Sequence, residues 1–568
     1  MTSGRILPAS CRALLLALAF CAPVLAGAAP RERLFPPCSP VAGTVEVVDV
    51  RGETPSRRVA AATLQGLVNA GPEASVYLLV RDTDAFWLDV MTKKGQIRGT
   101  RAVTPDAFFA AHTPAAAKVF VYDPALPATI HLATMLAAVE QGMVAAPEDA
   151  ETVAPGRPVE DLRGRWPDAP SAYEWAFAEL WPRMRPDVVA CLHPSADMTG
   201  LRDYLVRQRV FTFWVTAPGT EEKPNPHHAR ERALAERVLA ASSPNTPVLG
   251  FWYSGPDPGL NEYDGVGLAG EYGKITVVSD WCANLSLLGG VPVDFGGIAA
   301  AQRARQEAAP PPLEPDKVYI GFNVVESGDA PCYLQTRQTE VWADPARGRV
   351  PIGWGLGLGA LELMPPVAAH LLETATPNDH WFAAISGAGY VHPYRAFMAR
   401  TPDPEAAWAE YLGLTDRLMR RAGLAELGLY TDAWKPFDRA VMDPVTRRFA
   451  DGVPEARLLM PGMGRDDGMN AENGTYPMGN RDVMTAHILT RWPTDYAALD
   501  RAARIERLAA EIREQTPAAR PAFMQVMALS WAYGPGEIAD TLAALGPEYR
   551  AVSLPQYRRL WRAAQGGE

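Results

Sequence analysis

Short apolar runs alternate with helical segments through the last part of the chain, and this alternation limits the folds that the chain can adopt. Seven such runs lie at residues 317–324, 350–356, 381–385, 427–431, 457–460, 523–529 and 550–552. Strands that alternate with helices usually pair in parallel, because each connection crosses back over the sheet. The pattern predicts an α/β fold whose C-terminal domain, residues 315–568, is a TIM-like β/α barrel of about seven strands. An open doubly wound sheet is the alternative.

Two smaller α/β domains are expected before the barrel. Residues 30–148 and residues 149–309 each alternate candidate strands, such as 45–50 and 274–279, with helical segments. The stretch 299–315 is polar and then proline-rich, which is typical of a linker between domains. No Gly-x-Gly-x-x-Gly or P-loop pattern follows these strands, so we expect neither a nucleotide nor any other cofactor.

The first residues have the pattern of a secretory signal peptide, which we place at residues 1–29. Arg5 and Arg12 are followed by the apolar stretch 14–20 and by small residues at 26–28. The mature chain is therefore expected to be exported, to a periplasm or beyond the cell, without a membrane span. The formal charge of −11 argues against nucleic acid as a partner.

Cysteine usage leaves two possibilities open. Cys38, Cys191, Cys282 and Cys332 lie beyond the signal segment, and none forms a Cys-x-x-Cys pair. A structural zinc site is therefore not expected. One or two disulfides, or buried free thiols, are both compatible with this spacing.

Polar and aromatic side chains follow most of the predicted barrel strands, where ligands meet either kind of α/β sheet. In chain order they are Glu326 and Asp329, Trp354, the loop residues Gly387, Gly389, Tyr390 and His392, then Asp432 and Trp434, Glu472 and Asn473, and Trp531. Carboxylates combined with aromatic rings are typical of a carbohydrate site. We predict Asp329 and Asp432 as the leading acid/base or nucleophile residues, followed by Glu326 and Glu472. The other residues of the series would contact the sugar, with core packing or solvation as the alternative for each one.

One of these loops carries a recognisable motif. The stretch Gly387-Ala388-Gly389-Tyr390-Val391-His392-Pro393 resembles the motif of the GxGYxYP family of glycoside hydrolases, with His392 where the family has Tyr. The segments 64–69, 121–124, 202–215, 284–286 and 347–354 are also similar to this family. The resemblance covers nearly the whole mature chain. It implies an N-terminal region joined to a C-terminal domain with a sugar-related role.

The loop after the first barrel strand departs from the family pattern. Where the family often has Asp-Gly-Asp-Asn, this chain has Ser327-Gly328-Asp329-Ala330. One carboxylate is absent, and Glu326 stands one position earlier. Neighbouring residues of an extended segment point to opposite sides, so Glu326 does not automatically replace the missing Asp.

These observations predict an exported glycoside hydrolase that acts on a poly- or oligosaccharide through paired carboxylates. The first alternative is a non-catalytic carbohydrate-binding protein, which would keep the aromatic residues but disperse the carboxylates. The second is a metal-dependent hydrolase such as a deacetylase, which needs converging Asp and His ligands. The barrel region offers His370, His380, His392 and His487 without a His-x3-His pair, so no metal is predicted.

Overall fold

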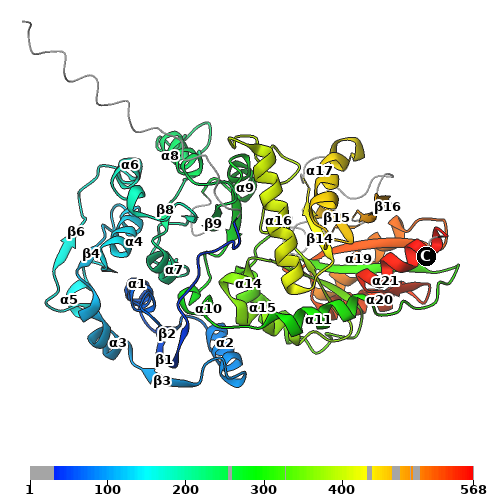
Figure 1. Cartoon of the computed structure of the whole chain (residues 1–568), viewed down its shortest axis with the longest axis horizontal. Coiled ribbons are helices and arrows are strands. Elements are labelled where there is room, and N and C mark those ends of the chain that lie inside the picture. The colour runs from blue at the N-terminus through cyan, green and yellow to red at the C-terminus, as the bar shows by residue number, and fades with distance from the viewer. Residues whose placement is uncertain are drawn as a thin grey trace, which may run out of the picture. The chain divides into compact units, whose positions relative to one another are not determined.

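The largest sheet has ten strands and belongs to the C-terminal part of the chain (Figure 1). The computed structural model describes residues 31–253, 259–325, 328–431, 438–463, 474–485, 488–489 and 499–566. The strand order is β16-β17-β15-β14-β13-β12-β11-β19-β18, and β20 also pairs with β11. All pairs are parallel except β16 with β17.

Seven strands of this sheet confirm the apolar runs seen in the sequence. They are β11 (Val318–Val325), β12 (Ile352–Leu356), β13 (Asp379–Ala383), β14 (Glu426–Tyr430), β15 (Leu458–Met463), β19 (Ala522–Leu529) and β20 (Tyr549–Ala551). Every residue of β11, β12, β13 and β14 is buried. Such continuous burial is typical of parallel strands that are covered on both faces.

Three short strands were not predicted from the sequence: β16 (Thr475–Met478), β17 (Arg481–Met484) and β18 (Ile488–Leu489). They are too short and too mixed in polarity to give a clear alternation. Within the described ranges, no ladder joins the β16 end of the sheet to the β18 end. The fold is therefore a mixed α/β fold with several parallel sheets, and a closed barrel stays a prediction.

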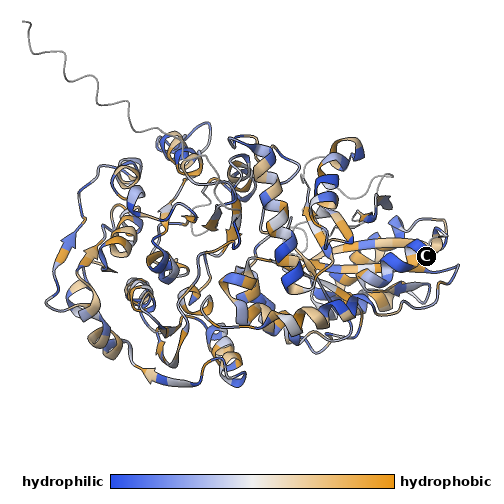
Figure 2. Cartoon of the chain, viewed as in Figure 1, coloured by the Kyte–Doolittle hydropathy of each residue, from blue (hydrophilic) through white to orange (hydrophobic). Residues whose placement is uncertain are grey.

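The helices of this region are α12 (Cys332–Gln335), α13 (Arg337–Trp342), α14 (Ala360–Leu363), α15 (Pro365–Glu373), α16 (Pro404–Ala422), α17 (Arg439–Gly452), α19 (Arg501–Gln515), α20 (Pro535–Leu545) and α21 (Leu554–Ala564). Figure 2 shows hydrophilic and hydrophobic residues side by side along them, as amphipathic helices require. The longest, α16, starts where the Asp403 side chain accepts a hydrogen bond from the Ala406 backbone N–H at 3.0 Å. It ends before Gly423, which has a left-handed conformation.

Three smaller parallel sheets precede the large one. They are β2-β1-β3, with β1 (Val41–Asp49), β2 (Ala74–Leu79) and β3 (Gly99–Val103); β5-β4-β6, with β4 (Val119–Val121), β5 (Met143–Ala145) and β6 (Val159–Asp161); and β10-β9-β7-β8, with β7 (Val189–Cys191), β8 (Phe211–Phe213), β9 (Pro247–Gly250) and β10 (Ile275–Val278). Their helices are α1 (Pro55–Asn69), α2 (Asp82–Lys93), α3 (Pro105–His112), α4 (Thr129–Glu140), α5 (Ala150–Val153), α6 (Ala169–Glu179), α7 (Arg202–Gln208), α8 (His228–Ala241), α9 (Glu262–Glu271) and α10 (Leu285–Leu288). Strand β10 lies at the edge of its sheet, so one side of its backbone is open to pair with another segment.

The predicted linker is partly helical. Helix α11 (Phe295–Gln306) covers the first half of the stretch 299–315, so the expectation of a linker there was wrong. The Asp294 side chain caps the helix, and Phe295 and Ile298 are buried. Phe295, Ile298, Ala299 and Gln302 recur at helical spacing and are all buried, and this burial outweighs the polar character of the sequence.

The four cysteines beyond the signal segment are free in the structure. Burial raises the pKa of the Cys282 thiol, and the neighbouring Cys332 thiol acts in the same direction. The described residues contain no group of three or more side chains that could hold a metal ion. Among the same residues, no helix is both long and apolar enough to cross a membrane.

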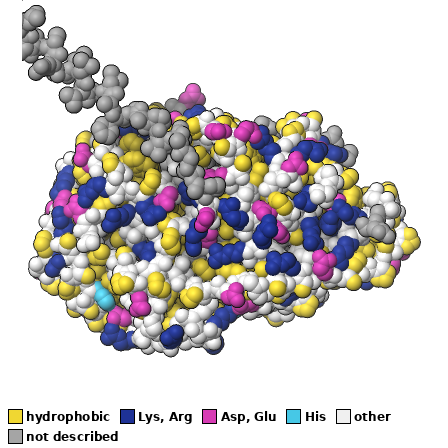
Figure 3. Space-filling model, viewed as in Figure 1, with side chains coloured by type: hydrophobic (Ala, Val, Ile, Leu, Met, Phe, Trp, Pro, Cys, Tyr) yellow, Lys and Arg dark blue, Asp and Glu magenta, His cyan; other side chains and the backbone are white. Residues whose placement is uncertain are grey.

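The face in Figure 3 carries interspersed acidic and basic side chains. The predicted signal peptide lies outside the described residues.

Candidate active site

The motif loop is attached by its backbone to the edge strand β10. The Thr276 N–H donates to the Tyr390 carbonyl at 3.1 Å, and the Tyr390 N–H donates to the Thr276 carbonyl at 2.9 Å. A Cβ atom at Gly389 would lie 2.4 Å from Cγ2 of Ile275. Glycine at this position therefore leaves room for the Ile275 side chain and for the close approach of the two backbones. Tyr390 is thereby held at a fixed position against the third of the small sheets.

The loop after β11 packs against the Tyr390 ring. Gly328 has a φ of +107°, and a Cβ atom there would lie 2.5 Å from the ring. Pro331, further along the same loop, pairs with Val278 at the end of β10. Asp329 follows Gly328 directly, so its backbone is fixed beside the motif tyrosine.

A carboxylate from helix α9 forms a hydrogen bond with the motif tyrosine. The Tyr390 hydroxyl donates a hydrogen bond to Oε1 of Glu262 at 2.8 Å. Glu262 is the first residue of α9, and Asn261 caps this helix by accepting a hydrogen bond from the Asp264 N–H at 2.9 Å. Burial raises the pKa of Glu262, and the hydrogen bond from Tyr390 acts in the opposite direction. Burial also raises the pKa of Tyr390, so the phenol stays protonated at neutral pH.

The His392 side chain lies within a group of aromatic rings. It stacks on Tyr430 with ring centres 4.6 Å apart, and it lies at a tilt of 35° to the Tyr263 ring, with centres 4.7 Å apart. The Tyr390 ring meets the His392 ring edge-on at 5.5 Å. His392 is 3% exposed. A flat ring can stack in this place, which is consistent with a histidine where the family motif has tyrosine.

Asp329 and Trp531 meet at the C-terminal ends of the neighbouring strands β11 and β19. The Trp531 indole N–H donates to Oδ2 of Asp329 at 3.1 Å. Trp531 is 42% exposed, and its ring packs edge-on against Tyr333 with centres 5.2 Å apart. The sequence predicted both residues as site members, and the structure brings them together.

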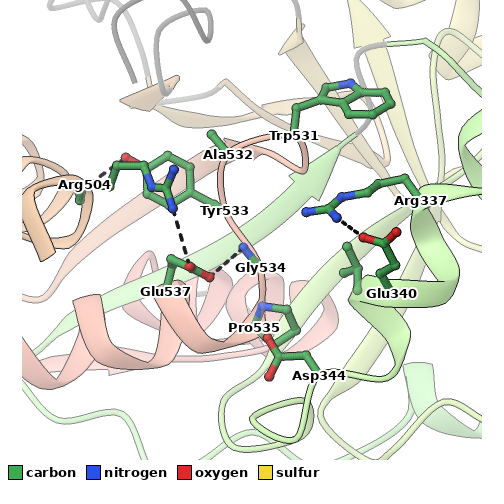
Figure 4. Close-up of a pocket in the computed structure, with 11 residues that line it drawn as sticks. Arg337, Glu340, Asp344, Arg504, Trp531, Ala532, Tyr533, Gly534, Pro535 and Glu537 are labelled. Carbon is green, nitrogen blue, oxygen red and sulfur yellow. Dashed lines mark hydrogen bonds and ion pairs between the residues drawn. The ribbon is translucent and has the colours of Figure 1, made fainter. Parts of the chain in front are cut away.

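Trp531 also lines a pocket of about 320 Å³. Figure 4 shows Trp531 and Arg337 on one side of it and Arg504 with Glu537 on the other. Arg337 forms an ion pair with Glu340, and Arg504 lies 3.9 Å from Glu537. The lining thus combines one exposed aromatic ring with carboxylate and guanidinium groups, which can bind hydroxyl groups in several directions.

Two predicted sugar-contacting residues are placed differently from the expectation. Trp354 is 1% exposed and donates its indole N–H to Asp379 at 2.9 Å, so it belongs to the core and not to a sugar platform. Its ring packs against Trp342 behind the strand. Gly387 is buried, and the backbone N–H of the next residue, Ala388, donates a hydrogen bond to the Thr415 hydroxyl. Gly387 and Gly389 therefore serve backbone packing in this structure.

Several predicted residues lie outside the described residues: Asp432, Trp434, Glu326, Glu472 and Asn473. Their roles stay predictions. Glu262, which stands with Asp264 and Glu271 between two predicted strands, is not among the site residues predicted from the sequence. Its signal was weak, because it consists only of a helix-capping Asn followed by acidic residues near a Gly/Pro-rich segment.

Comparison with known proteins shows which family the sequence of this chain matches. Family models match residues 44–110 ("GxGYxYP_N 1st domain"), 117–184 ("GxGYxYP_N second domain"), 186–290 ("GxGYxYP third domain") and 316–562 ("GxGYxYP putative glycoside hydrolase C-terminal domain"). No curated protein matches the chain.

Solved structures extend the comparison to the fold. A "putative hydrolase from Bacteroides thetaiotaomicron VPI-5482" superposes with a TM-score of 0.74 at 17% identity, over 94% of this chain and 98% of that one. A 4-alpha-glucanotransferase from Thermococcus litoralis (TM-score 0.28, 11% identity, 43% of this chain and 40% of that one) is too dissimilar to bear on the fold. The same holds for a "putative polysaccharide deacetylase from Mycobacterium smegmatis" (TM-score 0.26, 10% identity, 46% and 96%). Because models of all four domains match in order between residues 44 and 562, the chain belongs to the GxGYxYP family.

Proposed function

We propose that this protein is a glycoside hydrolase whose site lies at the C-terminal ends of β11 and β19. The observation that carries the proposal is the hydrogen bond that Asp329 accepts from the exposed Trp531, a residue that lines the pocket of about 320 Å³. The C-terminal family model, described as a glycoside hydrolase domain, supports a carbohydrate as the substrate. Export through residues 1–29 and closure of the large sheet into a barrel are part of the same proposal.

The chemistry of the pocket suits a sugar. One face of Trp531 can pack against the C–H groups of a pyranose ring, while its N–H keeps Asp329 in place. The charged groups of Arg337, Glu340 and Glu537 can bind sugar hydroxyls around that ring. Asp329 would then lie beside the bond to be cleaved, as a nucleophile or as the base that activates water.

The test is release of reducing ends from a panel of poly- and oligosaccharides. On the substrate that is cleaved, Asp329→Asn should lower kcat by about 100-fold or more with binding retained, because it removes the charge and keeps the shape. Trp531→Ala should weaken binding by about tenfold, because it removes the ring face. Asp316→Asn is the matched control, since this exposed aspartate precedes the opposite end of β11.

The outcomes separate the alternatives. A glycan that binds without release of reducing ends, with Asp329→Asn indistinguishable from the parent chain, would show a carbohydrate-binding protein instead. Loss of all activity on treatment with a chelator would favour the metal-dependent hydrolase.

A further inference from the structure

Helix α9, which lies outside the C-terminal domain, carries a carboxylate that contacts the motif tyrosine. Glu262 begins α9, which precedes β10 in the chain, and its Oε1 accepts the Tyr390 hydroxyl at 2.8 Å. The same Tyr390 ring rests against Gly328, the residue before Asp329. One aromatic ring therefore touches both the helix that carries Glu262 and the loop that carries Asp329.

We propose that Glu262 is the proton donor of the glycoside hydrolysis and that Tyr390 is its positioning residue. This inference rests on the proposed function and assigns the second carboxylate of the pair. The site would then be composite, with one carboxylate from the C-terminal domain and one from the domain that precedes it.

The hydrogen bond fixes which oxygen can act. Because Oε1 of Glu262 accepts the Tyr390 hydroxyl, the proton of the acid form is carried by Oε2. As the glycosidic C–O bond breaks, its electron pair stays on the leaving oxygen, which takes this proton. The oxygen of a water molecule bonds to the anomeric carbon, and one water proton ends on a carboxylate. The sum is one glycoside and one water converted into two free sugars.

The surroundings of Glu262 suit this role. Its partly buried carboxyl has a raised pKa, which is what a proton donor at neutral pH needs. Six charged or titratable groups surround Glu262 and Tyr390 or belong to that pair's contacts: Tyr263 and Asp264 on α9, Tyr390, His392 and Arg395 on or just after the motif loop, and Tyr430 at the end of β14. Arg395 pairs with Asp264 at 3.5 Å and lies over the Tyr263 ring, so the Asp264 carboxylate partly offsets its charge.

The experiment compares Glu262→Gln with Glu271→Gln, which changes the last residue of the same helix. Glu271 pairs with Arg400 at 3.1 Å, far along α9 from Tyr390. On the substrate found for the parent chain, Glu262→Gln should lower kcat by about 100-fold or more and abolish the loss of rate at high pH. Glu271→Gln should keep both the rate and the pH profile.

Tyr390→Phe provides the positioning test. Removing the phenol O–H takes away a hydrogen bond that favours the charged carboxylate, so the Glu262 pKa should rise. The high-pH limb of the kcat profile should therefore move to higher pH, which a merely structural role would not produce. Infrared titration of the parent chain against Glu262→Gln gives an independent readout. It should show a carboxyl that titrates above the ordinary value of 4.5.

The failures are distinguishable. If Asp329→Asn loses turnover while Glu262→Gln keeps it together with the high-pH limb, the role of Glu262 is overturned and the proposed function stands. An infrared titration of Glu262 at its ordinary value also overturns the role. If the parent chain releases no reducing ends from any glycan, the proposed function is overturned, and this role with it.

Discussion

A buried acid at the end of β10 makes the stability of the fold dependent on pH. Asp280 is 2% exposed, and burial raises its pKa from 3.8 to about 7. The folded-state pKa lies above the unfolded value, so the folded state holds the proton more tightly than the unfolded state does. The contribution to stability is complete below about pH 4 and is lost as the pH rises through about 7. Asp203, whose pKa burial raises to about 6, contributes with the same sign.

We therefore expect Asp280→Asn to flatten this part of the pH dependence. The parent chain should lose up to about 4 kcal/mol of unfolding free energy between pH 4 and pH 8 from this group, because the uncompensated charge stays buried. The variant, which cannot ionise, should not lose that amount. Urea unfolding at pH 4.5, 6 and 8 measures the difference. Equal slopes against pH in the two chains would contradict the assignment.

At the scale of elements, the start of α9 decides where Glu262 lies. Asn261 has a φ of +71°, and its side chain accepts the Asp264 N–H. Asn261→Ala should destabilise the chain by about 1–2 kcal/mol, because it removes the capping oxygen and because alanine tolerates a positive φ less well than asparagine does. Asn261→Asp keeps the capping oxygen and should restore most of the loss. Thermal unfolding followed by circular dichroism checks both, and equal melting temperatures for the Ala and Asp variants would rule out the capping role.

The strands could be predicted from the sequence to within a few residues, because burial on both faces makes most of them, such as β11 and β12, nearly continuous apolar runs. Elements could not be predicted where they are only partly buried, or where their burial depends on contacts with distant parts of the chain. The hairpin of β16 and β17 is too mixed in polarity to give a pattern, and α11 was assigned to a linker because its few buried residues lie among polar ones.

The candidate site was predictable only in part. Asp329, Tyr390 and Trp531 could be found because they follow apolar runs directly. Trp354 was misplaced, because within a strand buried on both faces the sequence does not show which side chains face the pocket. Glu262 was missed because its contact with Tyr390 spans 128 residues and depends on the approach of two sheets.

One buried residue, Gln335, joins three distant parts of the chain through its side-chain amide and its backbone carbonyl. The Gln335 side chain accepts from the Ala283 N–H and donates to the Ala283 carbonyl, both at 2.9 Å. Its backbone carbonyl accepts the Trp87 indole N–H at 2.8 Å. Residues Arg33–Glu568 form one compact unit, so these parts should unfold together.

Gln335→Ala should therefore lower the melting temperature of one cooperative transition without splitting it. The expected loss is about 2–4 kcal/mol, because two buried backbone groups lose their partners. Gln338→Ala is the matched control on α13. This side chain is equally buried, but its amide nitrogen has no hydrogen-bond partner within the described part of the chain. Calorimetry distinguishes the results, and two separate transitions in the Gln335 variant would refute the single-unit description.

Because the motif loop is bonded to a different sheet at each end, the number of residues between the two attachment points is fixed. Ser386 is fixed to β14 through its N–H, which donates to Gly428 at 2.7 Å, and its hydroxyl, which accepts the Tyr430 N–H at 3.0 Å. Tyr390 is fixed to Thr276 of the edge strand four residues later. An added or deleted residue between these anchors would detach the loop from one sheet or the other. The length of the segment is therefore a requirement of its own, in addition to the contacts that its glycines and its tyrosine make.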